Sequence, residues 1–134
     1  MILKFSEIYF DKVDDKVFDI KIGDHNVARD LDPFARAYGK YMPYDMFVEM
    51  TIKGGKLYIE NREVARGIKT GSGEKFIQVD FLKGKKDNPK VNAILLVKGS
   101  ASNTHKENFT NYQRLLLKLQ EEREKKRLQE ESFF

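Results

Sequence analysis

The sequence lacks cysteine altogether, which excludes a disulfide scaffold, a cysteine nucleophile and any thiolate metal site. Its two histidines, His25 and His105, leave little from which to build a zinc site. No apolar run approaches the roughly 18 residues of a membrane span, and the first residues lack the basic region and long apolar stretch of a signal peptide. We therefore expect no metal, no cofactor and no membrane insertion.

The sequence also lacks a concentration of charge of one sign. It carries 25 Lys and Arg against 21 Asp and Glu, a net charge of +4. Residues 1–100 hold 18 basic and 15 acidic side chains, and residues 101–134 hold 7 and 6. Because nucleic-acid binding needs a strongly basic face, this dispersed charge predicts no nucleic-acid partner. The 134 residues, 40% of them hydrophobic, suffice for one core.

Apolar residues recur with a period of two through the first hundred residues, which is typical of β-strands. A hairpin is predicted where residues 18–22 and 27–31 flank Gly23-Asp24-His25-Asn26. A second is predicted where residues 47–52 and 57–59 flank Gly54-Gly55. This spacing of short strands favours an all-β sandwich or jelly roll over alternating strands and helices.

Three further strands and two loops complete this prediction. The segment at residues 91–97 is nearly all apolar, as expected of a strand covered on both faces. The strands are expected near residues 3–10, 76–81 and 91–97, and the loops at residues 32–44 and 84–89.

The pattern becomes helical after Gly99. Two capping boxes, Thr104 to Glu107 and Thr110 to Gln113, provide alternative helix starts. An apolar stripe follows, and it predicts a docking face in its proximal part and an exposed, charged helix further on. The residues of this partner-binding stripe are Phe109, Tyr112, Leu116 and Leu119. We expect a β-sandwich domain at residues 1–99 and a linker with a charged helix at residues 100–134.

Signatures of enzymes are poor. Ser72 lies between two glycines, but the segment lacks the further glycines and the following helix of a phosphate-binding loop. No carboxylate is paired with a histidine at a catalytic spacing. The sequence therefore predicts a protein that is not an enzyme.

Two segments combine aromatic and polar residues in a way that suits a carbohydrate. Tyr9 and Phe10 end the first strand, and Asp87 lies in a polar loop between two apolar strands. Sugar sites need flat aromatic faces and fixed acceptors, and an ionised Asp accepts several hydroxyl hydrogen bonds. Aromatics at a strand end more often belong to a core, and an Asp before a proline turn can be a structural cap. The pattern leaves both interpretations open.

Several motifs, in order along residues 3–99, resemble the malectin domain family. The resemblance implies a jelly-roll-like β-sandwich. It also implies a non-catalytic binding role, since the family includes a diglucose-binding lectin of the endoplasmic reticulum and domains of kinesin-like motor proteins. The motifs are Phe5-Ser6-Glu7-Ile8-Tyr9-Phe10, residues 17–23, Asp30-Leu31-Asp32, residues 81–94 and Val97-Lys98-Gly99.

By this resemblance the carbohydrate-binding residues are Tyr9, Phe10 and Asp87. Two features depart from the family. Its domain has an earlier half with two further sugar-stacking tyrosines, none of which precedes Met1 here, and Lys85 and Lys86 stand where the lectin has aromatics. We expect the missing strands to be supplied by another segment or another subunit.

Two functions are expected from the residues and the resemblance together. The first is a module that binds a glucose disaccharide or oligosaccharide, within a larger protein or assembly. The alternative is a protein-interaction or anchoring module of a kinesin-like or ciliary cytoskeletal assembly that has lost sugar binding, with residues 104–134 as its connector. The expected location is the cytoplasm, in association with the cytoskeleton, with the lumen of the endoplasmic reticulum as the alternative.

Overall fold

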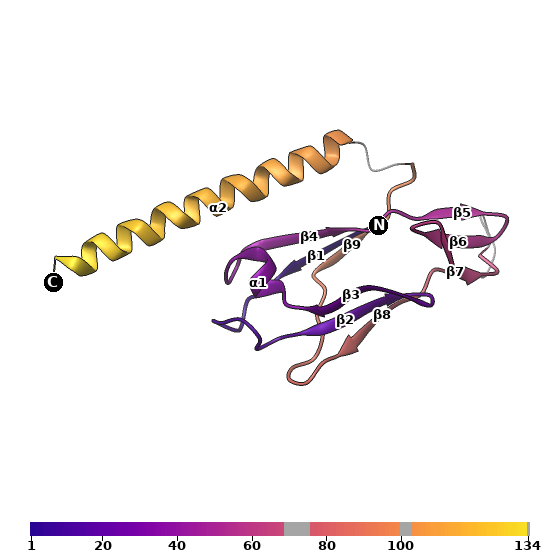
Figure 1. Cartoon of the computed structure of the whole chain (residues 1–134), viewed down its shortest axis with the longest axis horizontal. Helices are drawn as coiled ribbons and strands as arrows, with labels where there is room; N and C mark the ends of the chain where they lie inside the picture. Colours follow the sequence, from indigo (N-terminus) through magenta and orange to yellow (C-terminus); the bar gives the residue numbers. More distant parts are fainter. Residues whose placement is uncertain (69–75, 100–102, 134) are drawn as a thin grey trace. The chain divides into compact units, whose positions relative to one another are not determined.

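The computed structural model describes residues 1–68, 76–99 and 103–133, and for residues 103–113 it describes the backbone alone. The chain divides into two compact units, Met1–Ser100 and Ala101–Phe134. The first is rich in strands, and the second contains the helix α2 (Asn103–Ser132) (Figure 1). The β-rich fold with a C-terminal helix that the sequence predicted is confirmed.

The strands in the described part of the first unit form three antiparallel sheets of three strands each. The strand orders are β4-β1-β9 in the first sheet, β3-β2-β8 in the second and β5-β6-β7 in the third. The bounds are β1 Ile2–Ser6, β2 Phe18–Ile22, β3 His25–Leu31, β4 Pro43–Phe47, β5 Thr51–Lys53, β6 Lys56–Ile59, β7 Arg62–Arg66, β8 Val79–Lys83 and β9 Ala93–Leu95.

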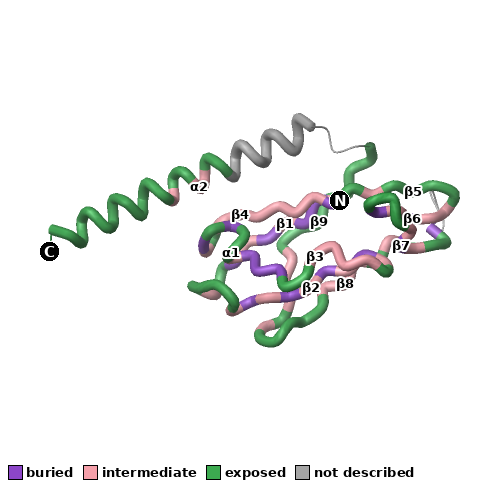
Figure 2. The backbone as a smooth tube through the Cα atoms, in the orientation of Figure 1, coloured by how far each residue is buried: buried purple, intermediate pink, exposed green. Residues whose placement is uncertain are grey.

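The first two sheets pack face to face, and alternate side chains of β1 and β2 form the core between them. Buried residues of the backbone are purple in Figure 2. The ring centre of Phe18 lies 5.9 Å from that of Phe5 and 6.5 Å from that of Phe81. Phe18, like Leu3 and Ile20, is fully buried. This aromatic contact joins the layers of the sandwich that the sequence predicted.

The third sheet has a core of its own at the far end of β2. Leu57 and Val64 are buried there with Ile22, the last residue of β2. The turn after β2 docks on β7, because the N–H of Asp24 donates to the carbonyl oxygen of Val64 over 2.8 Å. The two predicted hairpins, β2–β3 and β5–β6, are both present.

The first strand is shorter than predicted, because it ends at Ser6 instead of running to Phe10. The carboxylate of Glu7 accepts hydrogen bonds from the backbone N–H groups of Tyr9 and Phe10, over 3.0 and 3.3 Å. These bonds turn the chain out of the sheet, so Ile8 and Tyr9 are exposed.

The predicted loop at residues 32–44 contains the short helix α1 (Pro33–Ala37), so that prediction was wrong in part. Asp32 caps this helix, since its side chain accepts a hydrogen bond from the N–H of Ala35, and Pro33 occupies the first turn. Strand β7 was missed, because the turn before it uses Glu60 and Asn61 in the left-handed region instead of glycine.

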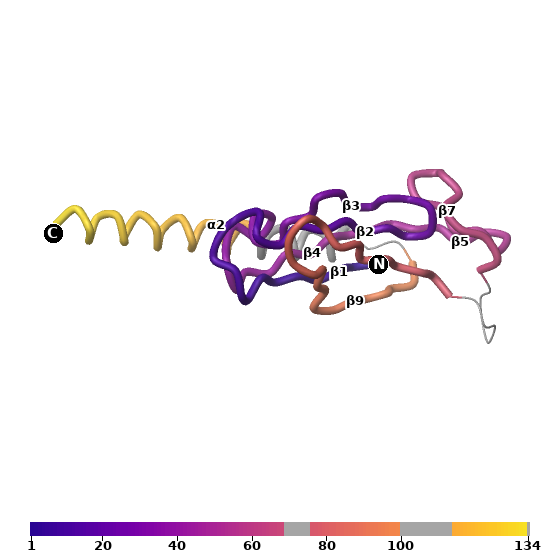
Figure 3. The backbone as a smooth tube through the Cα atoms, turned by 90° about the horizontal axis from the view of Figure 1, so that it is seen from below, coloured from indigo at the N-terminus to yellow at the C-terminus, as the bar shows by residue number. Residues whose placement is uncertain are grey.

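The exposure of strand β9 contradicts the prediction for residues 91–97. Residues 91–97 were expected to be covered on both faces, yet Ile94 and Leu95 in β9 are 48% and 40% exposed. Strand β9 pairs with β1 on one side. It is the outer strand of its sheet in the described part of the chain (Figure 3). Its second edge has no neighbouring strand there, and neither of its faces is fully covered.

We predict that two glycines of similar backbone conformation differ in their tolerance of a side chain. Gly23 has φ +55° and Gly54 has φ +59°, but an added Cβ would lie 2.1 Å from the Val64 carbonyl oxygen at Gly23 and meets nothing within 4 Å at Gly54. Urea denaturation should show that Gly23→Asn lowers the free energy of unfolding by about 1–3 kcal/mol. Gly54→Asn, the matched control, should lower it by less than about 1 kcal/mol. Equal losses would contradict this docking of the turn.

Candidate functional site

The two aromatic residues predicted to bind sugar lie together in the loop after β1. Tyr9 is 76% exposed and Phe10 is half-buried. Their ring centres are 5.0 Å apart and nearly perpendicular, an edge-to-face arrangement. The buried carboxylate of Glu7 holds both backbone N–H groups. Tyr9 therefore presents a ring to solvent from a loop with fixed backbone.

Asp87 is brought to this loop by a lysine that the sequence analysis missed. The ammonium of Lys16 lies 2.6 Å from Oδ2 of Asp87 and donates to the carbonyl oxygen of Asn88 over 3.0 Å. The same ammonium lies 5.6 Å from the ring centre of Phe10. Lys16 thus connects Phe10 with Asp87, although it lies 71 residues before Asp87 in the chain.

No local signal marks Lys16 as part of a site. It follows Asp14 and Asp15 in what the sequence presents as a charged turn, yet its side chain is buried. A buried ammonium requires a partner of opposite charge. The requirement is met here by Asp87 from the loop between β8 and β9.

The Asp87 carboxyl is held ionised by this contact. The hydrogen bond from Lys16, with a backbone hydrogen bond from Asn88, places the pKa of Asp87 below its ordinary value of 3.8. An ionised carboxylate has about four acceptor positions, of which these bonds use two. Asp87 therefore retains the capacity to accept hydroxyl hydrogen bonds from a ligand.

A second exposed aromatic, Tyr41, borders the same loop and was also missed. Its backbone N–H donates to the carbonyl oxygen of Glu7 over 2.7 Å, and its side chain is 67% exposed. The ammonium of Lys40 lies 5.1 Å from the Tyr41 ring centre and 2.9 Å from Oδ1 of Asp11. The hydrogen bond with Asp11 raises the pKa of Lys40. Tyr41 lay in the segment expected to be a plain loop, which offered no reason to place it against Glu7.

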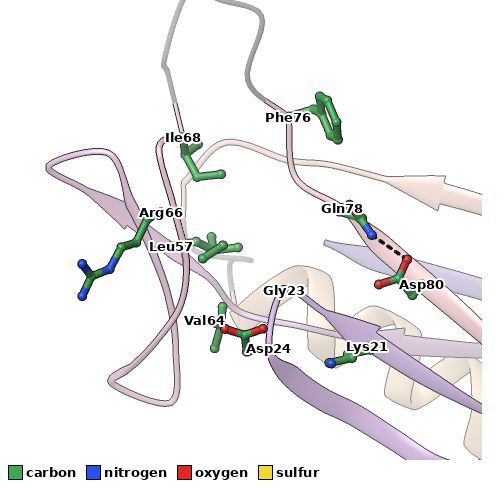
Figure 4. Close-up of a pocket in the computed structure, with 11 residues that line it drawn as sticks. Lys21, Gly23, Asp24, Leu57, Val64, Arg66, Ile68, Phe76, Gln78 and Asp80 are labelled. Atoms are coloured by element: carbon green, nitrogen blue, oxygen red, sulfur yellow. Dashed lines mark hydrogen bonds between the residues drawn. The ribbon is translucent and has the colours of Figure 1, made fainter.

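A hollow of about 420 Å³ lies elsewhere on the first unit, beside the β2–β3 turn and β7 (Figure 4). Its lining includes buried Leu57 and Val64, and polar side chains such as Asp24 and Asp80. Gln78 donates to Asp80 over 2.9 Å at its rim. Its lining contains neither Tyr9 nor Phe10 nor Asp87, so it is separate from the predicted sugar site.

Only part of the predicted partner-binding stripe of the C-terminal helix can be placed. Leu116 is partly buried and Leu119 is 43% exposed. The side chains of Phe109 and Tyr112 lie outside the described residues. Leu128, further along α2, is 53% exposed.

The described residues are 1–68, 76–99 and 103–133, with the backbone alone for 103–113. Within these ranges no helix has the length and apolar character needed to cross a bilayer. Nor do these residues contain a group of three or more His, Asp or Glu side chains placed to hold a metal ion.

The chain is similar to known proteins over most of its first unit. The model of the malectin domain matches residues 1–94. Malectin-A of Xenopus laevis is 39% identical over 101 residues, which cover 75% of this chain and 34% of that protein. Human malectin is 36% identical over 106 residues, 79% of this chain and 34% of its own length. The chain thus spans about a third of the length of these relatives, and it belongs to the malectin domain family.

Proposed function

We propose that the first unit is a non-catalytic carbohydrate-binding module for a glucose disaccharide or oligosaccharide, with Tyr9, Phe10 and Asp87 as its ligand-binding residues. The observation that carries this proposal is the Lys16 bridge, which holds the Asp87 carboxylate near the half-buried Phe10 ring, against which the exposed Tyr9 ring packs. Membership of the malectin domain family supports it.

The chemistry of a pyranose ring suits this arrangement. The C–H face of the sugar packs on the exposed Tyr9 ring, and Asp87 accepts hydrogen bonds from neighbouring hydroxyl groups. Tyr41 offers a second exposed ring next to Glu7. In this proposal Lys16 is a positioning residue, because its ammonium is buried against Asp87 and the Asn88 carbonyl.

The module belongs, in this proposal, to a larger protein or assembly. The relatives extend over about three times the matched length, and β9 has an uncovered outer edge in the described part of the chain. Strands from another segment or another subunit would cover that edge. The location, cytoplasmic or in the lumen of the endoplasmic reticulum, stays a prediction.

A second candidate function is a protein-interaction or anchoring module with α2 as its connector. The observation that favours it is the exposure of leucines on α2, with Leu115 and Leu128 each 53% exposed and Leu119 43% exposed. The cytoskeletal assembly expected from the resemblance, kinesin-like or ciliary, stays a prediction about the partner.

Sugar binding predicts a defined set of NMR shifts. Titration of nigerose or maltose should move the amide signals of Tyr9, Phe10 and Asp87. Tyr9→Ala should weaken binding about three- to tenfold, the worth of one aromatic contact, and Asp87→Asn should weaken it as well. Phe76→Ala is the control, because Phe76 is 73% exposed but lines the separate hollow. If the spectra do not change at millimolar sugar, the proposal of sugar binding is wrong.

The ion pair of Lys16 and Asp87 predicts how the stability of the folded chain depends on pH. Because the folded pKa of Asp87 lies below 3.8, its ionised form contributes stability that is present above about pH 3.8 and is lost as the pH falls through the lowered value. Lys16→Met keeps the length of the side chain but removes the cation. It should raise the Asp87 pKa in a carboxyl-carbon NMR titration and weaken sugar binding. An identical pKa in both proteins would show that the pair is not formed.

The second candidate predicts that leucines of α2 carry partner contacts. Leu119→Lys should lower the yield of a defined cross-linked partner from cell extract, while the amide spectrum of the first unit stays the same. Lys118→Arg, which keeps the charge at a neighbouring exposed position, serves as the control. A yield unaffected by Leu119→Lys would count against α2 as connector.

A further inference from the structure

The ion pair of Lys40 and Asp11 has the same arrangement as the ion pair of Lys16 and Asp87. The Lys40 ammonium lies 2.9 Å from Oδ1 of Asp11 and 5.1 Å from the ring centre of Tyr41. The Lys16 ammonium lies 2.6 Å from its aspartate and 5.6 Å from the centre of its aromatic ring. Each lysine therefore connects one aromatic ring with one carboxylate.

In both pairs the lysine is the more buried partner and the aspartate is the more exposed one. The side chain of Lys40 is 25% exposed, whereas that of Asp11 is 83% exposed. The hydrogen bond from Lys40 uses one of about four acceptor positions of the Asp11 carboxylate. Asp11 can therefore accept further hydrogen bonds from the hydroxyl groups of a ligand.

Tyr41 presents an aromatic ring to solvent from a fixed backbone. Its side chain is 67% exposed, and the Lys40 ammonium lies over its ring. Its backbone has φ +65°, and its N–H donates to the carbonyl oxygen of Glu7 over 2.7 Å. A large L-residue rarely adopts this left-handed conformation. The ring is thus kept exposed at a position that glycine would occupy with less strain.

This second ring and carboxylate are attached to the loop that carries the proposed sugar site. The loop after β1 and the helix α1 lie at the same end of the first unit (Figure 1). The Glu7 carboxylate accepts hydrogen bonds from the N–H groups of Tyr9 and Phe10. The Glu7 carbonyl oxygen accepts one from Tyr41. Asp11 follows Phe10 directly in the chain, so the two sets of residues adjoin.

We propose that Tyr41 and Asp11 form a second sugar subsite, so that this chain prefers an oligosaccharide longer than a disaccharide. The inference rests on the proposed function, because a disaccharide occupies the site of Tyr9, Phe10 and Asp87. The next sugar unit packs its C–H face on the Tyr41 ring, and its hydroxyl groups donate to Asp11.

The chemistry of this subsite suits a neutral sugar better than other ligands. An apolar side chain of a peptide would use the Tyr41 ring but would leave the Asp11 carboxylate without a new partner. An anion would be repelled by that carboxylate. A polyhydroxylated ring uses the aromatic face and the acceptor oxygens together, and it adds no charge.

The test compares two disaccharides with their trisaccharides, maltose with maltotriose and nigerose with nigerotriose, by calorimetry and NMR on the full chain. In at least one pair the trisaccharide should bind about three- to tenfold more tightly, the worth of one further aromatic contact. It should also shift the amide signals of Asp11, Lys40 and Tyr41, which the disaccharide leaves in place.

The outcomes separate this inference from the proposed function. If neither the disaccharides nor the trisaccharides bind, the sugar site and the second subsite are both wrong. If the disaccharides bind and both trisaccharides bind with the same affinity, the proposed function stands and the second subsite is overturned.

Substitution of Tyr41 tests the ring of the subsite. Tyr41→Gly removes the ring but keeps the backbone N–H that donates to Glu7, and glycine adopts positive φ without strain. It should abolish the advantage of the trisaccharide and leave the affinity for the disaccharide unchanged. Tyr38→Gly is the matched control, because Tyr38 is also an exposed tyrosine with positive φ. Equal losses in the two variants would overturn the assignment to Tyr41.

Substitution of Asp11 tests the acceptor. Asp11→Asn keeps the shape of the side chain but removes its charge and one acceptor oxygen, so it should reduce the advantage of the trisaccharide. Asp14→Asn is the control, since Asp14 is an exposed carboxylate of the same loop and is not the partner of Lys40. If Asp11→Asn keeps the whole advantage, the subsite as proposed is wrong.

Discussion

The packing of Phe5 against Phe18 determines how the first two sheets of the first unit meet. These rings belong to neighbouring layers, and their contact places β1 over β2. Because β1 ends at Ser6 and β2 begins at Phe18, both ends of the connecting segment stay at the same end of the sandwich. The pairing of Phe18 with Lys83 brings the end of β8 there too. Loops that are distant in the sequence therefore meet at one end of the domain, where the candidate site lies.

At that end the dominant interaction is electrostatic. The side chain of Lys16 is largely buried, so its charge needs an opposite charge and hydrogen-bond acceptors close by. Asp87 and the Asn88 carbonyl provide these, and the Phe10 ring adds a cation–π contact. One buried cation thus fixes the spacing between an aromatic loop and a carboxylate. The Tyr9 ring and the free lone pairs of Asp87 remain on the solvent side, as a polyhydroxylated ligand would require.

Strand β9 is apolar, and one of its edges has no neighbouring strand in the described part of the chain. The interior between the layers is well filled, with Leu3, Phe18 and Ile20 fully buried. The exposed apolar side chains of Ile94 and Leu95 therefore lie at the side of the sandwich and not at its centre. The site at the end of the domain and the edge at its side are separate surfaces.

The sequence alone determined the features that depend on neighbouring residues. Gly23 and Gly54-Gly55 marked the two hairpins because glycine reaches positive φ without strain, and the change of period after Gly99 marked the helix. The motifs around Tyr9 and Asp87 pointed to the malectin domain family. What only the tertiary structure decided depends on residues far apart in the chain: the burial of Lys16 against Asp87, the place of Tyr41 beside Glu7, and the exposure of β9. An apolar run specifies that a strand is suited to burial, but whether it is buried depends on which other strands lie beside it.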